Sequence, residues 1–154
     1  MRVLIIEDEP VLSRLYARVL KAEGFDVDIA GNGRLGMEAA ARRLYDLCVT
    51  DIRMPEITGI QLYELWKTER SRMARRLLFI TGDILSGAIQ AFLKKSGRPF
   101  IEKPFTPEEL VAAVKKTLAQ VCGAPTRGKN YREIGYRRKT NGNGNRSTLD
   151  THRR

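Results

Sequence analysis

The chain has 154 residues, of which 42% are hydrophobic and 30% charged, and its formal net charge is +10 at pH 7. That length allows one domain with a buried core and leaves some chain over. Two cysteines exclude a disulfide framework or a cysteine-rich metal site, and no apolar run approaches the roughly 18 residues of a membrane span, so a soluble cytoplasmic protein is expected.

Most of the positive charge lies near the carboxyl terminus. Residues 122–154 hold nine Lys and Arg but only two Asp and Glu, so they carry +7 and leave +3 for residues 1–121. This segment has no hydrophobic periodicity, and it cannot bury enough apolar surface to offset the entropy lost on ordering. We therefore predict a domain over residues 1–121 and a basic, disordered tail over residues 122–154, with no attached output domain. A solvated tail is favoured over one that binds nucleic acid or an anionic surface through its Tyr, Arg and Lys residues.

Short apolar runs alternate with longer amphipathic stretches along residues 1–121. Strands are predicted at 3–6, 27–30, 47–50, 77–80 and 99–101, and helices at 12–19, 35–44, 60–66, 84–95 and 107–120. The first, third and fourth strands are predicted to be buried on both faces. The alternation predicts an α/β fold with a doubly wound, five-stranded parallel sheet in the order 2-1-3-4-5 and five helices, as in flavodoxin-like proteins.

Helix ends are marked at two places. Gly24 lies where a C-cap would end the first helix. The last helix should begin after Thr106 as N-cap, with Pro107 at its first position and Glu109 completing a capping box. The apolar face of the first helix is predicted from residues spaced three and four apart, namely Leu12, Leu15, Tyr16 and Val19.

Some side chains could be assigned a functional role but are more simply explained as core or solvent-exposed residues. Cys48 lies in an apolar run and is expected to be a small core residue. Trp66 is expected in or near the core, with a partner contact as the alternative. A basic run precedes the fourth strand and is expected to be a solvated loop, with a partner surface as the alternative; it comprises Arg70, Arg72, Arg75 and Arg76.

Polar residues fall at the carboxyl ends of four predicted strands. Glu7 and Asp8 follow the first strand, Asp51 follows the third, Thr81 ends the fourth and Lys103 follows the fifth. The carboxyl ends of parallel strands form the ligand crevice of such a sheet, and the order 2-1-3-4-5 places the first and third strands side by side. We therefore expect these five side chains to converge.

Three carboxylates at close range repel one another unless a hard cation joins them. Mg²⁺ prefers a few carboxylates together with water and phosphate oxygens, so a Mg²⁺ site is expected. A carboxylate beside that ion can act as a nucleophile toward a phosphoryl group. Lys103 could then supply positive charge to the phosphoryl oxygens, and Thr81 a hydroxyl donor.

These residues lie in motifs by which the chain resembles the receiver domains of two-component response regulators, over roughly residues 1–121. The resemblance implies a CheY-like version of the flavodoxin-like fold. The motifs are Ile5-Ile6-Glu7-Asp8-Glu9, Thr50-Asp51-Ile52-Arg53-Met54-Pro55 with Gly59 eight residues after Asp51, Thr81-Gly82, and Lys103-Pro104-Phe105.

The resemblance implies a role for each residue of the crevice. Asp51 is phosphorylated, and Thr81 and Lys103 contact the phosphoryl group. The Mg²⁺ ligands that it implies are Glu7, Asp8, Asp51 and the backbone carbonyl of Arg53.

The resemblance also implies a conformational switch. The Thr81 hydroxyl moves toward the phosphate, and Phe100, at the family's aromatic switch position, turns inward. An aromatic residue in an edge strand can equally be a simple packing residue. The resemblance further implies a cis peptide bond between Lys103 and Pro104, which is uncommon among X-Pro bonds.

A receiver domain needs partners. The phosphodonor implied is a histidine kinase or a histidine phosphotransfer protein, and small-molecule phosphodonors can also serve. An unknown downstream protein must read the switch. Such a protein is no turnover enzyme, because it catalyses only its own phosphorylation and dephosphorylation.

Three other functions are considered. A pseudo-receiver would keep the fold as an interaction module without phosphorylation, and the complete set of crevice residues argues against it. A Mg²⁺-dependent phosphohydrolase with an aspartyl nucleophile usually carries a second Asp two residues later, where this chain has Arg53. A flavin-binding module would need hydroxyls in its phosphate loop, where this chain has Glu7 and Asp8.

Two charged residues should flank the mouth of the crevice. Arg53 lies two residues beyond Asp51, and Asp83 lies two residues beyond Thr81. We predict that they form an ion pair and that the pair, or Arg53 alone, alters how fast water reaches the acyl phosphate. Two independently solvated charges are the alternative.

Overall fold

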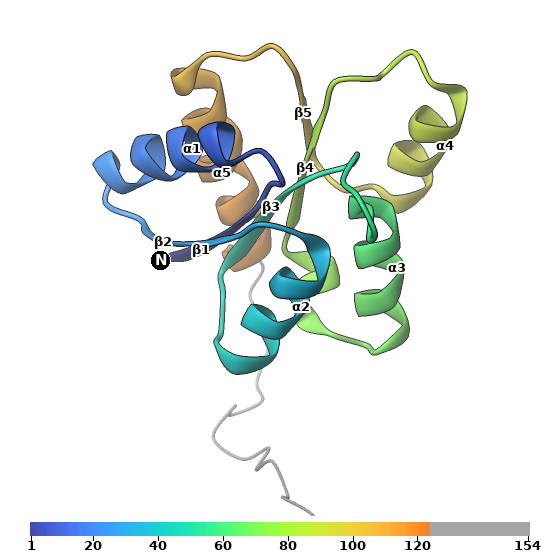
Figure 1. The fold of residues 1–154 in the computed structure, drawn as a ribbon, viewed down its shortest axis with the longest axis horizontal. Coiled ribbons are helices and arrows are strands. Elements are labelled where there is room, and N and C mark those ends of the chain that lie inside the picture. The colour runs from blue at the N-terminus through green and yellow to red at the C-terminus, as the bar shows by residue number, and fades with distance from the viewer. Residues whose placement is uncertain (124–154) are drawn as a thin grey trace, which may run out of the picture.

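The computed structural model describes residues 1–123, and the predicted tail, apart from Cys122 and Gly123, lies outside the described residues. Five parallel strands form one sheet in the order β2-β1-β3-β4-β5 (Figure 1), which confirms the predicted topology. The strands are β1 (Arg2–Ile6), β2 (Asp26–Ala30), β3 (Leu47–Asp51), β4 (Leu77–Thr81) and β5 (Phe100–Glu102).

Helices cover both faces of this sheet (Figure 1). α1 and α5 pack on one face, and α2, α3 and α4 pack on the other. None of the helices within residues 1–123 is long and apolar enough to cross a membrane. The helices are α1 (Pro10–Ala22), α2 (Gly33–Arg42), α3 (Gly59–Thr68), the 3-10 turn η1 (Arg72–Arg75), α4 (Gly87–Ser96) and α5 (Pro107–Cys122).

The central strands β1, β3 and β4 are buried on both faces, as predicted. Successive side chains of a strand point to opposite faces. In β1, Val3 and Ile5 therefore join the core beneath α1 and α5, while Leu4 and Ile6 join the core beneath α2, α3 and α4. Trp66 and Cys48 lie in this second core, which confirms their predicted placement.

Local sequence signals determine where two helices begin or end. At the start of α5 the Thr106 hydroxyl accepts the Glu109 N–H at 3.2 Å, and the Glu109 carboxylate accepts the Thr106 N–H at 2.7 Å. This is the predicted capping box. After α1, Gly24 adopts a φ of +85°, a conformation that suits glycine, so the predicted end of this helix is also confirmed.

The predicted apolar face of α1 is wrong in part. Tyr16 is buried, but Leu15 is 47% exposed, and Leu12 and Val19 are only half-buried. The face that packs on the sheet includes Ser13, whose hydroxyl donates to the Pro10 carbonyl at 3.1 Å. A polar residue can be buried when its donor is satisfied within its own helix, and hydrophobicity alone does not reveal this.

Two further expectations also need correction. The second helix ends at Arg42, because Arg43 is extended, and Leu44 is therefore 70% exposed beyond the helix. Arg76 is not a solvated loop residue. Its guanidinium donates to the Tyr45 carbonyl at 3.2 Å and pairs with Asp46 at 3.5 Å, which joins the starts of β3 and β4.

Candidate functional site

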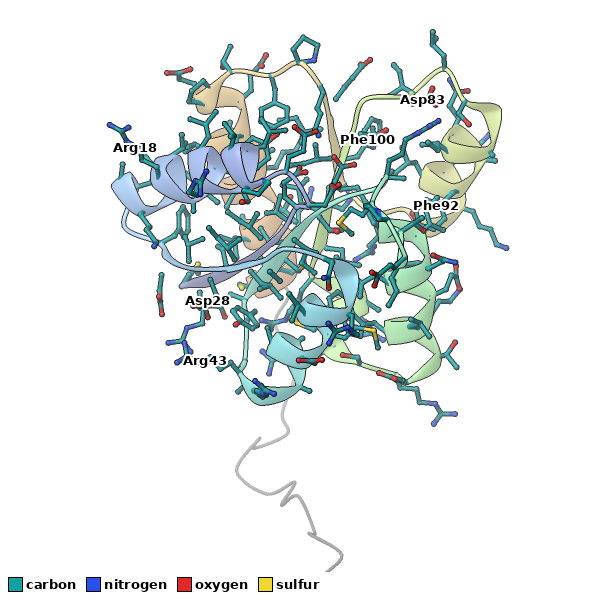
Figure 2. All side chains as sticks on the ribbon, in the orientation of Figure 1. Arg18, Asp28, Arg43, Asp83, Phe92 and Phe100 are labelled. Atoms are coloured by element: carbon teal, nitrogen blue, oxygen red, sulfur yellow. The ribbon has the colours of Figure 1, made fainter. Side chains whose placement is uncertain are left out.

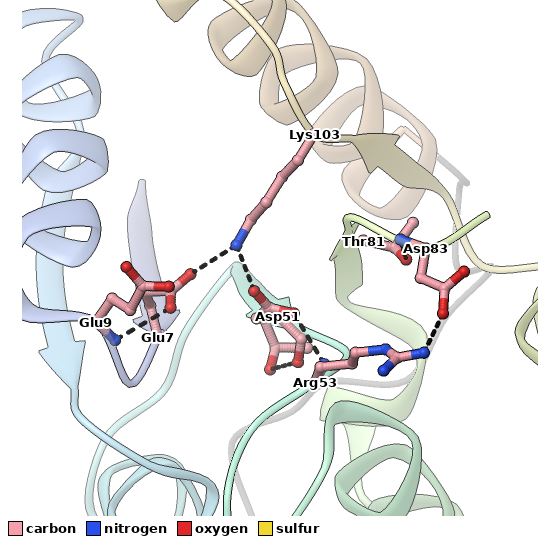
Figure 3. A network of polar contacts seen from close by, with 8 residues as sticks. Glu7, Glu9, Asp51, Arg53, Thr81, Asp83 and Lys103 are labelled. Atoms are coloured by element: carbon pink, nitrogen blue, oxygen red, sulfur yellow. Dashed lines mark hydrogen bonds and ion pairs between the residues drawn. The ribbon is translucent and has the colours of Figure 1, made fainter. Parts of the chain in front are cut away.

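Carboxylates from β1 and β3 meet at the carboxyl edge of the sheet (Figure 3). β1 and β3 are neighbours, with Ile6 paired to Thr50, so the next residues, Glu7 and Asp51, are brought together. Lys103 follows β5 and reaches between them. Its Nζ lies 2.5 Å from Asp51 Oδ2 and 3.6 Å from Glu7 Oε2. Three predicted site residues therefore converge as expected.

Asp51 is held by the backbone around it. It is the last residue of β3 rather than the residue after it, and its side chain is buried. Its Oδ1 accepts the N–H of Arg53 at 2.8 Å, while Oδ2 faces Lys103. Gly59 packs directly against this turn, since a Cβ there would lie 2.4 Å from the Asp51 carbonyl oxygen. The motif contains Gly59, but only the packing shows why a larger residue would not fit.

Glu7 is 2% exposed, although it carries a titratable group. One carboxylate oxygen, Oε1, accepts the Glu9 N–H at 3.2 Å, while Oε2 is a buried oxygen with no hydrogen-bond partner. Burial raises the pKa of Glu7 to about 6, and the charges of Asp51 and Asp8 act in the same direction, against the opposing effects of the Glu9 N–H and Lys103. The site therefore contains a buried carboxylate oxygen that receives no hydrogen bond, and the Lys103 ammonium lies 3.6 Å from it.

Lys103 partly neutralises this cluster. Burial lowers its pKa, but the hydrogen bond and the charge of Asp51 more than offset that effect, so the pKa of Lys103 is raised overall. The ammonium group remains charged at neutral pH and faces two carboxylates. It can therefore stabilise negative charge that develops on a group bound at Asp51.

The predicted Mg²⁺ ligands lie at this edge. Asp8 follows Glu7 and is half-buried. Among residues 1–123 no three His, Cys, Asp or Glu side chains are grouped closely enough to hold a metal as they stand. The ammonium of Lys103 takes up the space between Glu7 and Asp51. Glu7 Oε2, which accepts no hydrogen bond, and its neighbouring carboxylates are hard oxygen donors, so the residues present fit Mg²⁺ chemically.

Thr81 and Asp83 line the next part of the crevice (Figure 3). Thr81 ends β4, is buried, and accepts the Asp83 N–H through its hydroxyl at 3.2 Å. The Asp83 carboxylate pairs with Arg53 through Oδ2, which confirms the predicted ion pair, and accepts the Ser86 N–H at 3.1 Å through Oδ1. Sequence reasoning missed the contacts of Asp83 with Thr81 and Ser86, which are local turn contacts; a Thr or Asp at the start of a turn is the signal that could have indicated them.

The predicted switch residue Phe100 lies apart from the carboxylates. It begins the edge strand β5, where it pairs with Phe79, and its side chain is 48% exposed (Figure 2). The bond between Lys103 and Pro104 is cis, as the resemblance implied.

Comparison with known proteins identifies the family. The family model described as "Response regulator receiver domain" matches residues 3–115. Among curated proteins, the transcriptional regulatory protein RprY of Bacteroides fragilis is 30% identical over 135 residues, which cover 88% of this chain and 56% of RprY. The response regulator ArlR of Staphylococcus saprophyticus is 33% identical over 117 residues, or 76% of this chain and 52% of ArlR. The chain thus spans about half the length of these relatives.

A solved structure agrees with this result. A CheY-like response regulator receiver domain protein from Methanospirillum hungatei is 26% identical and has a TM-score of 0.71, covering 79% of this chain and 96% of the other. Its fold is the one built here from strand order and helix placement. The chain therefore belongs to the family of response regulator receiver domains of two-component systems.

Proposed function

We propose that Asp51 accepts a phosphoryl group in a Mg²⁺-dependent phosphorelay reaction. The observation that carries this proposal is the placement of Asp51 at the carboxyl edge of the sheet, 2.5 Å from the Lys103 ammonium and beside the buried Glu7. A carboxylate in such a position can act as a nucleophile, and the adjacent cation can neutralise the charge of a transferred phosphoryl group.

The transfer would exchange one bond to phosphorus for another. A carboxylate oxygen of Asp51 forms the new P–O bond as the bond between phosphorus and the donor's nitrogen or oxygen breaks, and the donor atom leaves with the electron pair and gains a proton. The Lys103 ammonium then moves from the carboxylate to a phosphoryl oxygen. The Thr81 hydroxyl accepts the Asp83 N–H, so its own proton is available for another phosphoryl oxygen.

Four groups would hold the metal ion. We assign this role to the carboxylates of Glu7, Asp8 and Asp51 and to the backbone carbonyl of Arg53. The support is the buried Glu7 Oε2, which has no hydrogen-bond donor and would be satisfied by a hard cation. When bound, Mg²⁺ would supply positive charge to the carboxylates and to the phosphoryl oxygens.

The proposed effect of phosphorylation is a change in the surface that the domain presents to a partner protein. The Thr81 hydroxyl would leave the Asp83 N–H for the phosphate, and the half-exposed Phe100 would turn inward. A downstream protein would read this change, and a histidine kinase or histidine phosphotransfer protein would be the donor. The protein would then act as a switch that catalyses only its own phosphorylation and dephosphorylation. Once the phosphodonor has been removed, phosphate release should therefore stop at one phosphate per phosphorylated chain.

Intact mass spectrometry after incubation with acetyl phosphate tests the proposal. The wild type should gain one phosphoryl adduct with Mg²⁺ and none without it, and Asp51→Asn should gain none. Asp26→Asn, the same change on an exposed strand residue, is the control and should be phosphorylated like the wild type. An adduct on Asp51→Asn would refute the site. No adduct from either acetyl phosphate or a protein phosphodonor would indicate a pseudo-receiver.

A further inference from the structure

A group of cations lies near the end of the sheet opposite the proposed phosphorylation site. The carboxylates of the proposed phosphorylation site lie at the carboxyl edge of the sheet. Near the opposite end, six exposed or half-buried cationic side chains come from four segments, and we call this set the basic surface: Arg72 and Arg75 of η1, Lys94 and Lys95 of α4, Arg98 before β5, and Lys116 of α5. Among the described residues, no carboxylate forms an ion pair with any of these six.

The part of the sequence that supplies five of these six cations contains few acidic residues. Between Arg70 and Ile101 the one carboxylate is Asp83, which lies at the crevice mouth and is paired with Arg53. Lys94 and Lys95 occupy the last turn of α4, where cations interact favourably with the helix dipole. The same effect reaches Arg98, which follows the C-cap Gly97, but it does not account for Lys116, which lies before the last turn of α5.

Two members of the basic surface line the same hollow. Arg98 and Lys116 flank a hollow of about 430 Å³ between β5 and α5, together with Phe100 and Gln120. Arg98 is held in place because its Nη1 donates to the Arg75 carbonyl at 2.8 Å. The hollow therefore combines two cations, a half-exposed aromatic ring and a side-chain amide.

Phe100 separates this hollow from a second one of opposite character. The second hollow is lined by Glu102, Glu109 and Lys103, and Lys103 is paired to Asp51 at the carboxyl edge. An anionic ligand on the ring of Phe100 would be repelled on the Glu102 side and attracted on the Arg98 side. The charge pattern therefore decides on which side of the ring a polyanion would bind.

We propose that the basic surface and its hollow bind single-stranded nucleic acid. Arg98 and Lys116 contact backbone phosphates, a base stacks on the ring of Phe100, and the Gln120 amide hydrogen-bonds to a base edge. Sequence-tolerant binding of single strands combines a cationic groove with aromatic stacking in this way. An anionic lipid headgroup would use the cations but would leave the ring and the amide without a role.

Fluorescence anisotropy with a labelled oligothymidylate and the full, unphosphorylated chain tests this proposal. The double variant Arg98→Glu/Lys116→Glu should bind at least about tenfold more weakly than the wild type, because two phosphate contacts are lost, and the slope of log K against log salt should fall by roughly 1.4. Phe100→Ala, which leaves the net charge unchanged, should weaken binding roughly fivefold or more, whereas Phe100→Tyr should retain most of it.

The matched control separates this site from non-specific attraction, including that of the cationic residues beyond 123. Arg14→Glu/Arg18→Glu makes the same change in net charge on exposed residues of α1 (Figure 2 labels Arg18) and should weaken binding far less. Equal losses in the two double variants would refute the proposal. So would unchanged binding by Phe100→Ala, or binding to phosphatidylserine vesicles that is stronger than binding to the oligonucleotide.

A second copy of the chain could occupy the same hollow instead. Light scattering on the wild type and on Arg98→Glu/Lys116→Glu decides this point. If the double variant loses self-association but keeps its affinity for the oligonucleotide, the hollow is a protein interface and the proposal is wrong. Circular dichroism and urea denaturation of each variant verify that the fold is retained, and a variant that is unfolded is replaced by Arg98→Gln/Lys116→Gln.

Discussion

The buried carboxyl group of Glu7 should lower the stability of the folded protein at neutral pH. Burial raises the pKa of Glu7 from an ordinary value of 4.5 to about 6. Because one pKa unit corresponds to about 1.4 kcal/mol, keeping this group charged in the folded state costs about 2 kcal/mol. Glu7→Gln keeps the shape of the side chain and removes the charge. We therefore expect the variant to be more stable by up to about 2 kcal/mol at neutral pH without Mg²⁺.

The pH dependence follows from the direction of this pKa change. Between pH 4.5 and about 6, the folded protein holds a proton on Glu7 that the unfolded chain has lost. The folded state therefore binds more protons, and this group's contribution to stability falls as the pH rises through that window. The advantage of Glu7→Gln should be largest above about pH 6 and should vanish below pH 4.5.

Urea denaturation of both proteins across this pH range, with EDTA present, measures the difference directly. Subtracting the two free energies of unfolding cancels the contributions of the other carboxyl groups. Glu69→Gln, the same substitution on an exposed residue, should change the stability by less than about 0.5 kcal/mol. If Glu7→Gln is no more stable than the wild type at neutral pH, the attraction between Glu7 and Lys103 outweighs burial, and the reasoning is wrong.

Three further predictions concern packing, a partly buried hydrogen bond and the crevice mouth. Gly59→Ala should lower the free energy of unfolding by about 1–3 kcal/mol or more, because the added Cβ would lie 2.4 Å from the Asp51 carbonyl oxygen. Urea denaturation measures this change, and an unchanged midpoint would contradict the contact. Tyr45→Phe removes the hydroxyl that donates to Asp28 at 2.7 Å and should cost about 1 kcal/mol while leaving phosphorylation by acetyl phosphate intact. Arg53→Ala should shorten the half-life of the phosphorylated protein by a factor of up to about 5, the range expected for an exposed ion pair, because it uncovers the crevice mouth. An unchanged half-life would show that this ion pair does not control access of water.

Much of the fold could be predicted because its signals are local. An apolar run such as residues 77–80 is itself the buried strand, and the capping box of Thr106 and Glu109 acts within one helical turn. The face of α1 could not be predicted in the same way. Its buried side includes Ser13, whose burial depends on a hydrogen bond to Pro10 that hydrophobic periodicity does not reveal.

The candidate site could be predicted in part for a related reason. Parallel strands bring their carboxyl ends to one edge, so residues that follow strands were expected to meet, and Glu7, Asp51 and Lys103 do meet. The contacts of Asp83 with Thr81 and Ser86 span two and three residues, so they are local turn contacts that the sequence could have indicated. The missing hydrogen-bond donor at Glu7 Oε2 could not be predicted, because it depends on how whole elements pack around that oxygen.

The amino-acid pattern alone determined the order of strands and helices, the edge at which the chemistry gathers, and the family that these motifs indicate. Only the tertiary structure decided which oxygen of Asp51 faces Lys103 and that Glu7 keeps a buried oxygen without a hydrogen-bond donor at that edge. It also decided that Arg98 and Lys116 share one hollow elsewhere on the molecule. The reason is physical. Periodicity and caps act over one or two turns of chain, whereas these contacts join side chains that are far apart in sequence and depend on how whole elements pack.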